Sequence, residues 1–229
     1  VEFSQAFCRL GSEVILLDAG KRLIKDADPK ASRALQRILE SEGVEVHNQT
    51  LVDKVWRDDK GLHVQAGDDV FLTDQLLLSV GRRPNVSGMD LEQAGVDYDP
   101  RGIKVNRKMQ TSQANIYAAG DCTGGPQFTH VAGYQAFNAV RNALLPGSTK
   151  SVIENPPWTL FSDPEIAQVG LTSIQAKEKY GEDIQIKSWP MKHVDRAHTS
   201  GAKEGFVQVI YRKNGRVVGA TVVGKRAGE

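Results

Sequence analysis

Apolar and polar residues follow two different patterns along the first fifty positions. Apolar side chains at helical spacing predict helices over residues 1–10 and 29–42, each followed by a glycine. A short, almost wholly apolar run at 12–18 predicts a strand of the kind that a parallel sheet buries on both faces, and residues 44–48 predict another short strand. Helix and strand therefore alternate, which indicates a βαβ-type organisation.

The middle of the chain mixes short strands with one long helix. An apolar run at 74–80 leads into Gly81, and the helical spacing of residues 131–145 predicts the long helix. Turn residues at 58–61 and 67–69 separate alternating segments and predict an antiparallel meander. The expected short strands are 50–58, 61–66, 70–73, 103–105 and 115–119.

Pro156-Pro157 marks an expected domain boundary, because the pattern changes beyond it. One helix, 173–180, is expected among several strands, and Asn214-Gly215 predicts a hairpin between two of them. This half therefore resembles an α+β domain with an antiparallel sheet. Its expected strands are 158–161, 167–172, 184–191, 206–211 and 217–223.

Composition excludes several classes of protein. Of 229 residues, 29 are Lys or Arg and 28 are Asp or Glu, so the formal net charge is +1, and 40% are hydrophobic. These values argue against disorder and against a nucleic-acid surface, which needs an excess of basic charge. The two cysteines, Cys8 and Cys122, cannot frame a disulfide scaffold, and the absence of CxxC and HxxxH pairs argues against a zinc module.

No segment of the sequence predicts a membrane partner. The longest nearly uncharged stretches, such as 76–81 and 116–120, are far shorter than the ~20 residues that span a bilayer. Sparse cysteine and a soluble composition favour the cytoplasm. The chain starts without Met and stops in the glycine-rich segment 224–229, so we expect both ends to be cut.

Asp18 is a candidate for binding a nucleotide ribose. The sequence has no GxGxxG, but helix 1–10, the strand after it and Asp18 match what normally follows one. A carboxylate there accepts hydrogen bonds from both ribose hydroxyls and repels a 2′-phosphate, which favours NAD(H). Lys21 and Arg22 lie close behind and could soften that preference. The simpler alternative is an acidic residue that ends the strand of an ordinary βα repeat.

Gly120 and Asp121 end the segment TSQANIYAAGDC at 111–122. Glycine lets the backbone approach a ligand closely, and the aspartate could reach a chain of hydroxyls at the carboxyl edge of a sheet. The alternative is a simple Gly-Asp turn. Thr129, His130 and Val131 then open the long helix, whose free N–H groups would face an anion, such as a reduced flavin. For His130, a capping or packing role is favoured over that of a catalytic base.

Taken together, these motifs resemble the class I pyridine nucleotide–disulfide oxidoreductases, the flavoprotein group of dihydrolipoamide dehydrogenase, glutathione reductase and mercuric reductase. The order and spacing of the matching pieces are specific, although each alone is weak. The pieces are residues 1–3, 10–14, 80–85 (VGRRPN), 116–121, 161–167 (FSDPEIA), 169–172, 194–197, 218–221 and 227–229.

The resemblance implies an α/β Rossmann-type FAD/NAD-binding fold followed by an α+β interface domain. Residues 1–80 would be a partial NAD(P)-binding domain, and 81–150 the C-terminal segment of the FAD-binding domain. Residues 151–229 would be a truncated interface (dimerisation) domain that forms a homodimer. The cofactors implied are FAD and NAD(P)H, with NAD preferred because of Asp18.

The resemblance also assigns roles on the nucleotide side. Glu2 corresponds to the glutamate near the nicotinamide, and Asp18 to the acid that binds the ribose. Gly81 and Arg82 correspond to the loop that joins the two nucleotide-binding parts, close to both cofactors.

On the flavin side, Gly120 and Asp121 correspond to the turn whose aspartate binds the ribityl and pyrophosphate region. Thr129, His130 and Val131 correspond to the helix start beneath the flavin ring. No catalytic residue is assigned, because the sequence contains neither the redox-active CxxxxC nor the C-terminal His-Glu segment of the family. Cys8 and Cys122 are interpreted as ordinary core or loop residues.

The resemblance implies a parent enzyme that passes hydride from NAD(P)H to FAD and then electrons to a redox disulfide. The substrate, a small molecule or a disulfide, stays open among lipoamide, glutathione, mercuric ion and others. One alternative is an inactive remnant that serves only as a dimerising or binding module. Another is a flavoprotein without the cysteine pair, such as an NADH oxidase or a ferredoxin reductase.

Overall fold

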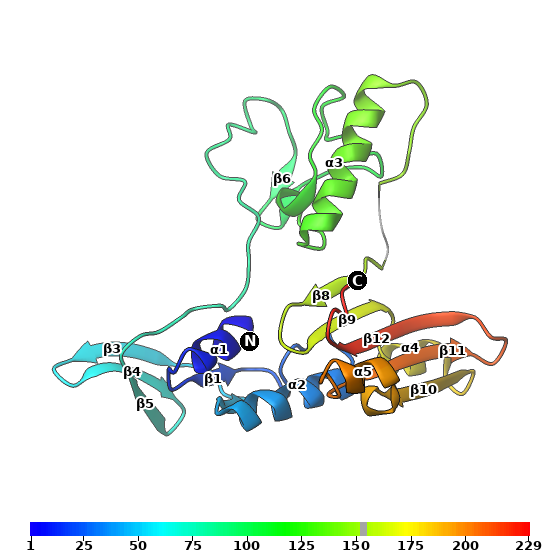
Figure 1. Ribbon diagram of the computed structural model, residues 1–229. Helices are drawn as coiled ribbons and strands as arrows, with labels where there is room; N and C mark the ends of the chain where they lie inside the picture. The colour runs from blue at the N-terminus through cyan, green and yellow to red at the C-terminus, as the bar shows by residue number, and fades with distance from the viewer. Residues whose placement is uncertain (152–154) are drawn as a thin grey trace. The chain divides into compact units, whose positions relative to one another are not determined.

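A computed structural model describes residues 1–151 and 155–229, which form two compact units. The first, here called unit 1, combines Val1–Leu77 with Pro157–Glu229, and unit 2 is Leu78–Pro156. Figure 1 shows the course of the chain through both units. Segments from the two ends of the sequence therefore share one folded unit, whereas the middle of the chain forms the other.

Unit 1 begins with helix α1 (Glu2–Arg9), strand β1 (Ile15–Asp18), helix α2 (Pro29–Glu42) and strand β2 (Glu45–Asn48). Asp28 caps α2, Pro29 occupies its first turn, and Gly43 ends it in the left-handed conformation with φ 104°. The predicted boundaries of α2 are confirmed. Strands β1 and β2 pair in parallel, with Ile15 opposite Glu45.

The expectation that strand 12–18 is buried on both faces is wrong. The strand begins only at Ile15, which is 39% exposed, and its other residues are half-buried. The physical reason is that, within the described part of the chain, β1 pairs with β2 alone. One edge of β1 is therefore open.

An antiparallel meander follows, made of β3 (Lys54–Asp58), β4 (Gly61–Ala66) and β5 (Asp69–Thr73) in that order. The meander is confirmed, although its first strand starts four residues later than expected. The apolar run 74–80 after it forms neither helix nor strand, and Val80 is 95% exposed.

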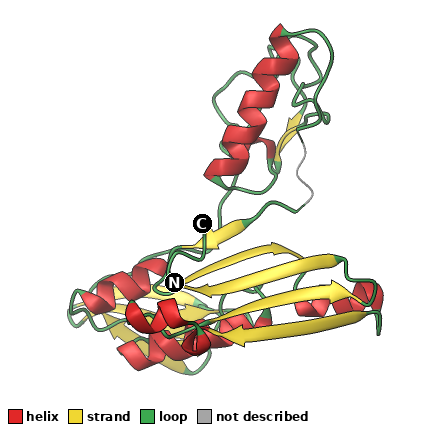
Figure 2. Cartoon of the chain, turned by 45° about the vertical axis from the view of Figure 1, so that its right-hand side comes forward, coloured by secondary structure: helices red, strands yellow, loops and turns green. Residues whose placement is uncertain are grey.

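The second half of unit 1 is a five-stranded antiparallel sheet of order β10-β11-β12-β9-β8. Figure 2 shows its strands beside one another. The five predicted strands and helix α4 are confirmed. Where the end of a strand differs from the expected one, it differs by one or two residues. The short helices η2 (Met191–His193) and α5 (Asp195–Thr199) were not expected. The other bounds are β8 Trp158–Leu160, β9 Glu165–Gly170, α4 Ser173–Tyr180, β10 Ile184–Pro190, β11 Phe206–Arg212 and β12 Val217–Gly224.

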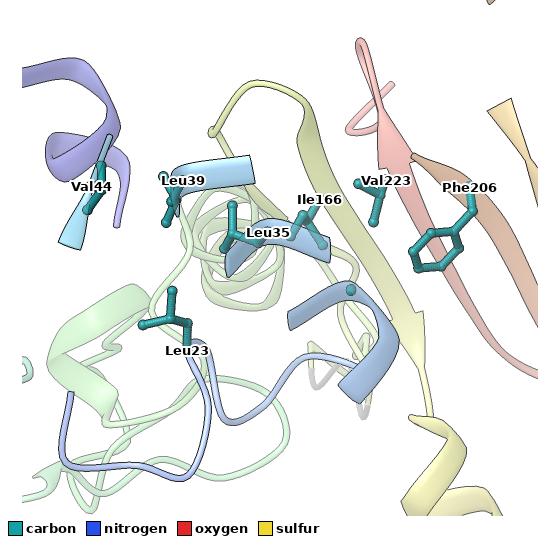
Figure 3. Packing of buried hydrophobic residues seen from close by; sticks show 8 residues of the cluster. Leu23, Leu35, Leu39, Val44, Ile166, Phe206 and Val223 are labelled. Carbon is teal, nitrogen blue, oxygen red and sulfur yellow. The ribbon is translucent and has the colours of Figure 1, made fainter. Parts of the chain in front are cut away.

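One hydrophobic core joins the two halves of unit 1. Leu35 and Leu39 of α2 lie in the same buried cluster as Ile166 of β9 and Val223 of β12, and none of the four is more than 1% exposed. Figure 3 shows these side chains between the helix and the sheet. The helix of the βαβ-type half therefore packs directly on the sheet of the other half.

A buried polar cluster reinforces this contact. Asp28, only 1% exposed, accepts hydrogen bonds from the backbone N–H groups of Lys30 (3.0 Å) and Ser173 (2.8 Å). Its own N–H donates to Oε1 of Gln168 at 2.8 Å. Burial opposes ionisation of Asp28, but the hydrogen bonds from Ser173 and Lys30 outweigh it and lower the pKa of this carboxyl. One carboxylate thus holds the starts of α2 and α4.

Unit 2 contains little regular structure. It consists of β6 (Tyr98–Asp99), β7 (Gly102–Ile103), the 3-10 helix η1 (Gly120–Thr123) and helix α3 (Thr129–Leu144). The expected strand at 115–119 is wrong, because only Tyr117 makes a single bridge there, to Gln110. The strand expected at 103–105 is reduced to Gly102–Ile103, and the long helix starts two residues earlier than expected.

Candidate functional site

Three arginines line a hollow of about 620 Å³ in unit 2, here called the arginine hollow. Arg82 and Arg83 come from the loop after residue 80, and Arg101 from the turn that joins β6 and β7. The glycine-rich loop 124–128 forms another wall, and none of the described acidic residues lines the space. Nη1 of Arg82 donates a hydrogen bond to the carbonyl of Gln127 at 3.4 Å. The hollow therefore offers positive charge to an anionic group.

The Gly-Asp turn rests against the first turns of α3. Gly120 has φ 79°, and its N–H donates to Oε1 of the buried Gln135 at 2.8 Å. A Cβ at this position would lie only 2.9 Å from the Cβ of Ala132, so glycine is required. Asp121 follows on the surface, and within the described residues its carboxylate accepts no hydrogen bond. This carboxylate is thus available to a ligand.

Within the described residues, no side chain caps the start of helix α3, and its first turn contains no acidic residue. Thr129 is exposed, and the ring of His130 stacks on Phe128 with centroids 5.6 Å apart. Val131 is only 2% exposed, so its side chain belongs to the interior and only its backbone could contact a ligand. An uncapped helix start carries partial positive charge, which adds to that of the arginines.

In unit 1, Asp18 and Glu2 both lie near the beginning of α1. Both carboxylates act on the amino group of Val1: burial lowers the pKa of this amino group, and the nearby negative charges of Glu2 and Asp18 oppose that shift without reversing it. Oδ1 of Asp18 accepts the N–H of Gly20 at 2.6 Å, which leaves its second oxygen without a hydrogen bond among the described residues. Glu2 accepts the N–H of Phe161 at 2.7 Å and so ties α1 to the end of β8.

The two basic residues behind Asp18 behave differently. Nη2 of Arg22 donates to the carbonyls of Lys25 (2.6 Å) and Ala27 (3.4 Å), so its guanidinium is engaged by the loop. Lys21 is exposed, and its ammonium has no partner in the part of the chain that the structure describes. Of the pair, only the side chain of Lys21 is not held in place by hydrogen bonds to the loop.

The structure gathers some of the predicted site residues and separates others. Gly81, with φ 139°, directly precedes Arg82, and Thr129 directly follows Phe128. Arg82 and Phe128 both line the arginine hollow. Asp121 does not line the hollow, and Glu2 and Asp18 belong to unit 1.

Sequence reasoning missed Arg101. A side chain at Gly124 would overlap the carbonyl oxygen of Arg101, so the β6–β7 turn packs closely on the glycine loop. The only hint in the sequence is the turn segment Pro100-Arg101-Gly102, which by itself predicts no ligand.

These groups fit the cofactors that the motifs imply. Guanidinium groups and an uncapped helix start suit the anionic parts of a dinucleotide, and free carboxylates suit its sugar hydroxyls. In the described residues, no cluster of three or more His, Cys, Asp or Glu side chains could hold a metal ion. No helix there is long and apolar enough to cross a bilayer.

Comparison with protein families gives two matches. Residues 1–136 match the pyridine nucleotide-disulphide oxidoreductase family, and residues 156–229 match the dimerisation domain of pyridine nucleotide-disulphide oxidoreductases. Together the two matches reach nearly the whole chain.

Relatives are similar over nearly the whole of this chain. A dihydrolipoyl dehydrogenase of Bacillus subtilis is 36% identical over 97% of the chain and 49% of its own length. A mercuric reductase of Staphylococcus aureus is 36% identical over 100% of the chain and 43% of its own length. The chain therefore spans about half the length of these relatives.

Two solved structures are similar to this chain over almost its whole length. The HOCl-induced flavoprotein disulfide reductase RclA from Escherichia coli gives a TM-score of 0.90 at 28% identity, over 99% of this chain and 52% of that one. LpdA from Mycobacterium tuberculosis gives 0.89 at 29% identity, over 100% and 50%. The expected fold, a nucleotide-binding α/β part followed by an α+β dimerisation domain, is confirmed. The chain belongs to the pyridine nucleotide-disulphide oxidoreductase family.

Proposed function

We propose that this chain carries cofactor-binding and dimer-forming parts of an NAD(H)-dependent FAD disulfide oxidoreductase. Residues 1–80 bind the pyridine nucleotide, 81–150 contribute to the flavin site, and 151–229 form a homodimer, with 152–154 outside the described residues. The observation that carries the proposal is the free Asp121 carboxylate, set on a glycine turn beside the uncapped start of α3.

In the flavin part, Asp121 accepts hydrogen bonds from hydroxyl groups of the ribityl chain. The backbone N–H groups of Thr129, His130 and Val131 face the negative edge of the ring system, and Gly81 and Arg82 border the same part. When bound, the flavin supplies two-electron transfer between a reduced pyridine nucleotide and a disulfide. The protein groups hold it and balance its charge.

In the nucleotide part, Asp18 selects NAD(H). Its second carboxylate oxygen accepts hydrogen bonds from the ribose hydroxyls, and its charge repels a 2′-phosphate. The guanidinium of Arg22 is held by loop carbonyls and is therefore not free to turn toward such a phosphate. Glu2 orients the start of α1 near the nicotinamide, through its hydrogen bond to the backbone of Phe161.

The substrate of the parent enzyme is a disulfide or a soft metal ion. The relatives support this range, because they are named dihydrolipoyl dehydrogenase, mercuric reductase and disulfide reductase. The chain by itself does not reduce a disulfide, because Cys8 and Cys122 lie in different units and each thiol hydrogen-bonds a carbonyl, at 3.2 and 3.3 Å. Free cysteines suit a reducing compartment, which favours the cytoplasm.

Backbone amide NMR of the 229-residue chain tests the flavin site even if binding is weak. Titration with FAD is expected to shift the resonances of Gly120, Asp121 and Thr129. Asp121→Asn should weaken the binding about tenfold, because a charge-assisted hydrogen bond contributes about 1.5 kcal/mol or more. Asp97→Asn, an exposed acid of the same unit, is the matched control and should leave the affinity unchanged.

Two outcomes would overturn the proposal. The first is that millimolar FAD leaves these three resonances unmoved. The second is that Asp121→Asn and Asp97→Asn bind FAD equally well.

A further inference from the structure

A second hollow, of about 400 Å³, lies in unit 1 and is lined by Arg196, Ser200, Lys225 and Arg226. We call it the basic hollow. Arg196 lies on α5, Ser200 follows the end of that helix, and Lys225 and Arg226 follow β12. Two segments that are distant in the sequence therefore bring three cations to one place. None of these residues belongs to the cofactor sites proposed above.

The positive charge of the basic hollow is not balanced. No acidic residue among those that the structure describes lines it. Among the described residues, the side chains of Arg196 and Lys225 make neither an ion pair nor a hydrogen bond. Arg226 approaches Glu229 only at 3.8 Å, and both side chains are about three-quarters exposed, so this pair contributes little.

Two other arginines of the same unit, Arg9 and Arg212, form close ion pairs. Arg9 contacts Glu42 at 2.6 Å and Asp163 at 2.7 Å, and Arg212 contacts Asp183 at 2.6 Å. Three like charges around one hollow repel one another unless an anion lies between them. What sets the basic hollow apart is that its three cations line the same space, where a bound anion would relieve their mutual repulsion.

The chemistry of the lining narrows the class of anion. Guanidinium groups bind oxyanions through paired hydrogen bonds, and an ammonium adds a point charge. Oγ of Ser200 already donates to the carbonyl of Arg196 at 2.8 Å, so the recognition rests on the three cations. A volume of about 400 Å³ is in the range of small-molecule sites and exceeds what a single phosphate fills.

We propose that the basic hollow binds a diphosphate group, either free pyrophosphate or the diphosphate of a nucleotide. The site does not rest on the flavin or NAD(H) assignment. The basic hollow lies within residues 156–229, which match the dimerisation domain, so a bound diphosphate would bring negative charge to that domain.

Amide NMR of the 229-residue chain at constant ionic strength tests this proposal. Pyrophosphate is expected to shift the resonances of Ser200, Lys225 and Arg226, with inorganic phosphate binding at least tenfold more weakly. ADP is the second arm: equal affinity for ADP and pyrophosphate identifies a nucleotide diphosphate as an acceptable source, and binding of pyrophosphate alone identifies the free anion. Failure of the flavin site would be seen at other residues, Gly120 and Asp121, so the two results are distinguishable.

Substitutions of the lining cations test which of them bind pyrophosphate. Arg196→Gln and the double variant Lys225→Gln/Arg226→Gln should each reduce the affinity at least tenfold. The matched control is Lys213→Gln/Arg216→Gln, two exposed cations at the β11–β12 turn, which should retain it. The proposal is wrong if millimolar pyrophosphate moves no resonance of the basic hollow or shifts only those of the arginine hollow. It is also wrong if the control variant loses affinity as strongly as the test variants.

Discussion

The interiors of the two units are built differently. Unit 1 has a core that runs from α2 to the five-stranded sheet, and Asp28 is buried in the polar cluster beside it. Unit 2 has a small cluster of three buried apolar residues, Leu91, Val96 and Ile103. The outer face of α3 meanwhile leaves Phe137 71% and Leu144 77% exposed.

This difference shows where cooperativity should be found. In unit 1 the segment Val1–Leu77 and the segment that matches the dimerisation domain share one interior, so a defect in either should weaken both. Unit 2 has far less buried apolar surface to hold it together. All three tryptophans, Trp56, Trp158 and Trp189, belong to unit 1, so tryptophan fluorescence follows its unfolding alone.

The largest expected effect comes from the shared core. Leu35→Ala should lower the free energy of unfolding of unit 1 by about 3 kcal/mol, because it leaves a cavity between α2 and the sheet. Urea unfolding followed by tryptophan fluorescence measures this loss. Leu10→Ala, at a position 81% exposed, is the control and should cost less than about 0.5 kcal/mol. Equal losses for the two variants would contradict a shared core.

A smaller effect is expected from the polar cluster. Asp28→Ala removes the cap of α2 and the acceptor for the N–H of Ser173, so unit 1 should lose about 2 kcal/mol. The same urea experiment applies, with Asp26→Ala as the exposed acidic control in the same loop. If Asp26→Ala proves as costly as Asp28→Ala, the cluster does not join the two halves as described.

The pH dependence of this cluster gives the smallest and sharpest test. Folding lowers the pKa of Asp28, so the ionised carboxylate stabilises unit 1 above its unfolded pKa of about 3.9 and loses that contribution as pH falls through the folded value. Wild type should therefore exceed Asp28→Asn in stability near neutral pH, and the gap should narrow below about pH 4. Urea midpoints over a pH series measure it, and a constant gap would argue against an ionised Asp28.

An element of this fold was predictable when residues next to it in the sequence determine it, and was not when it depends on a distant partner strand. Helix α2 was predictable to the residue, since Asp28, Pro29 and Gly43 supply its cap, first turn and end locally. Segments 12–18 and 115–119 were not, because a strand exists only where it has a partner. Ile15 begins β1 at the point where β2 runs alongside, and Tyr117 has one bridge.

The candidate site shows the same limit. Gly120 and Asp121 could be selected from the sequence, because a Gly-Asp turn before a helix is a local pattern. Arg101 could not be, because its place in the arginine hollow depends on how the β6–β7 turn packs against Gly124. The basic hollow likewise needs α5 and the end of β12 to meet, a contact between segments that are not neighbours in the sequence.

The open edge of β1 has a consequence for handling the molecule. Among the described residues β1 pairs only with β2, and a short strand whose backbone groups are unpaired along one side is a template for any extended chain that reaches it. Intermolecular pairing at that edge competes with native folding in proportion to protein concentration, whereas the contacts within unit 1 do not. We therefore expect the refolding yield of the 229-residue chain to rise on dilution, whereas the core of unit 1 sets the stability of the molecules that have folded.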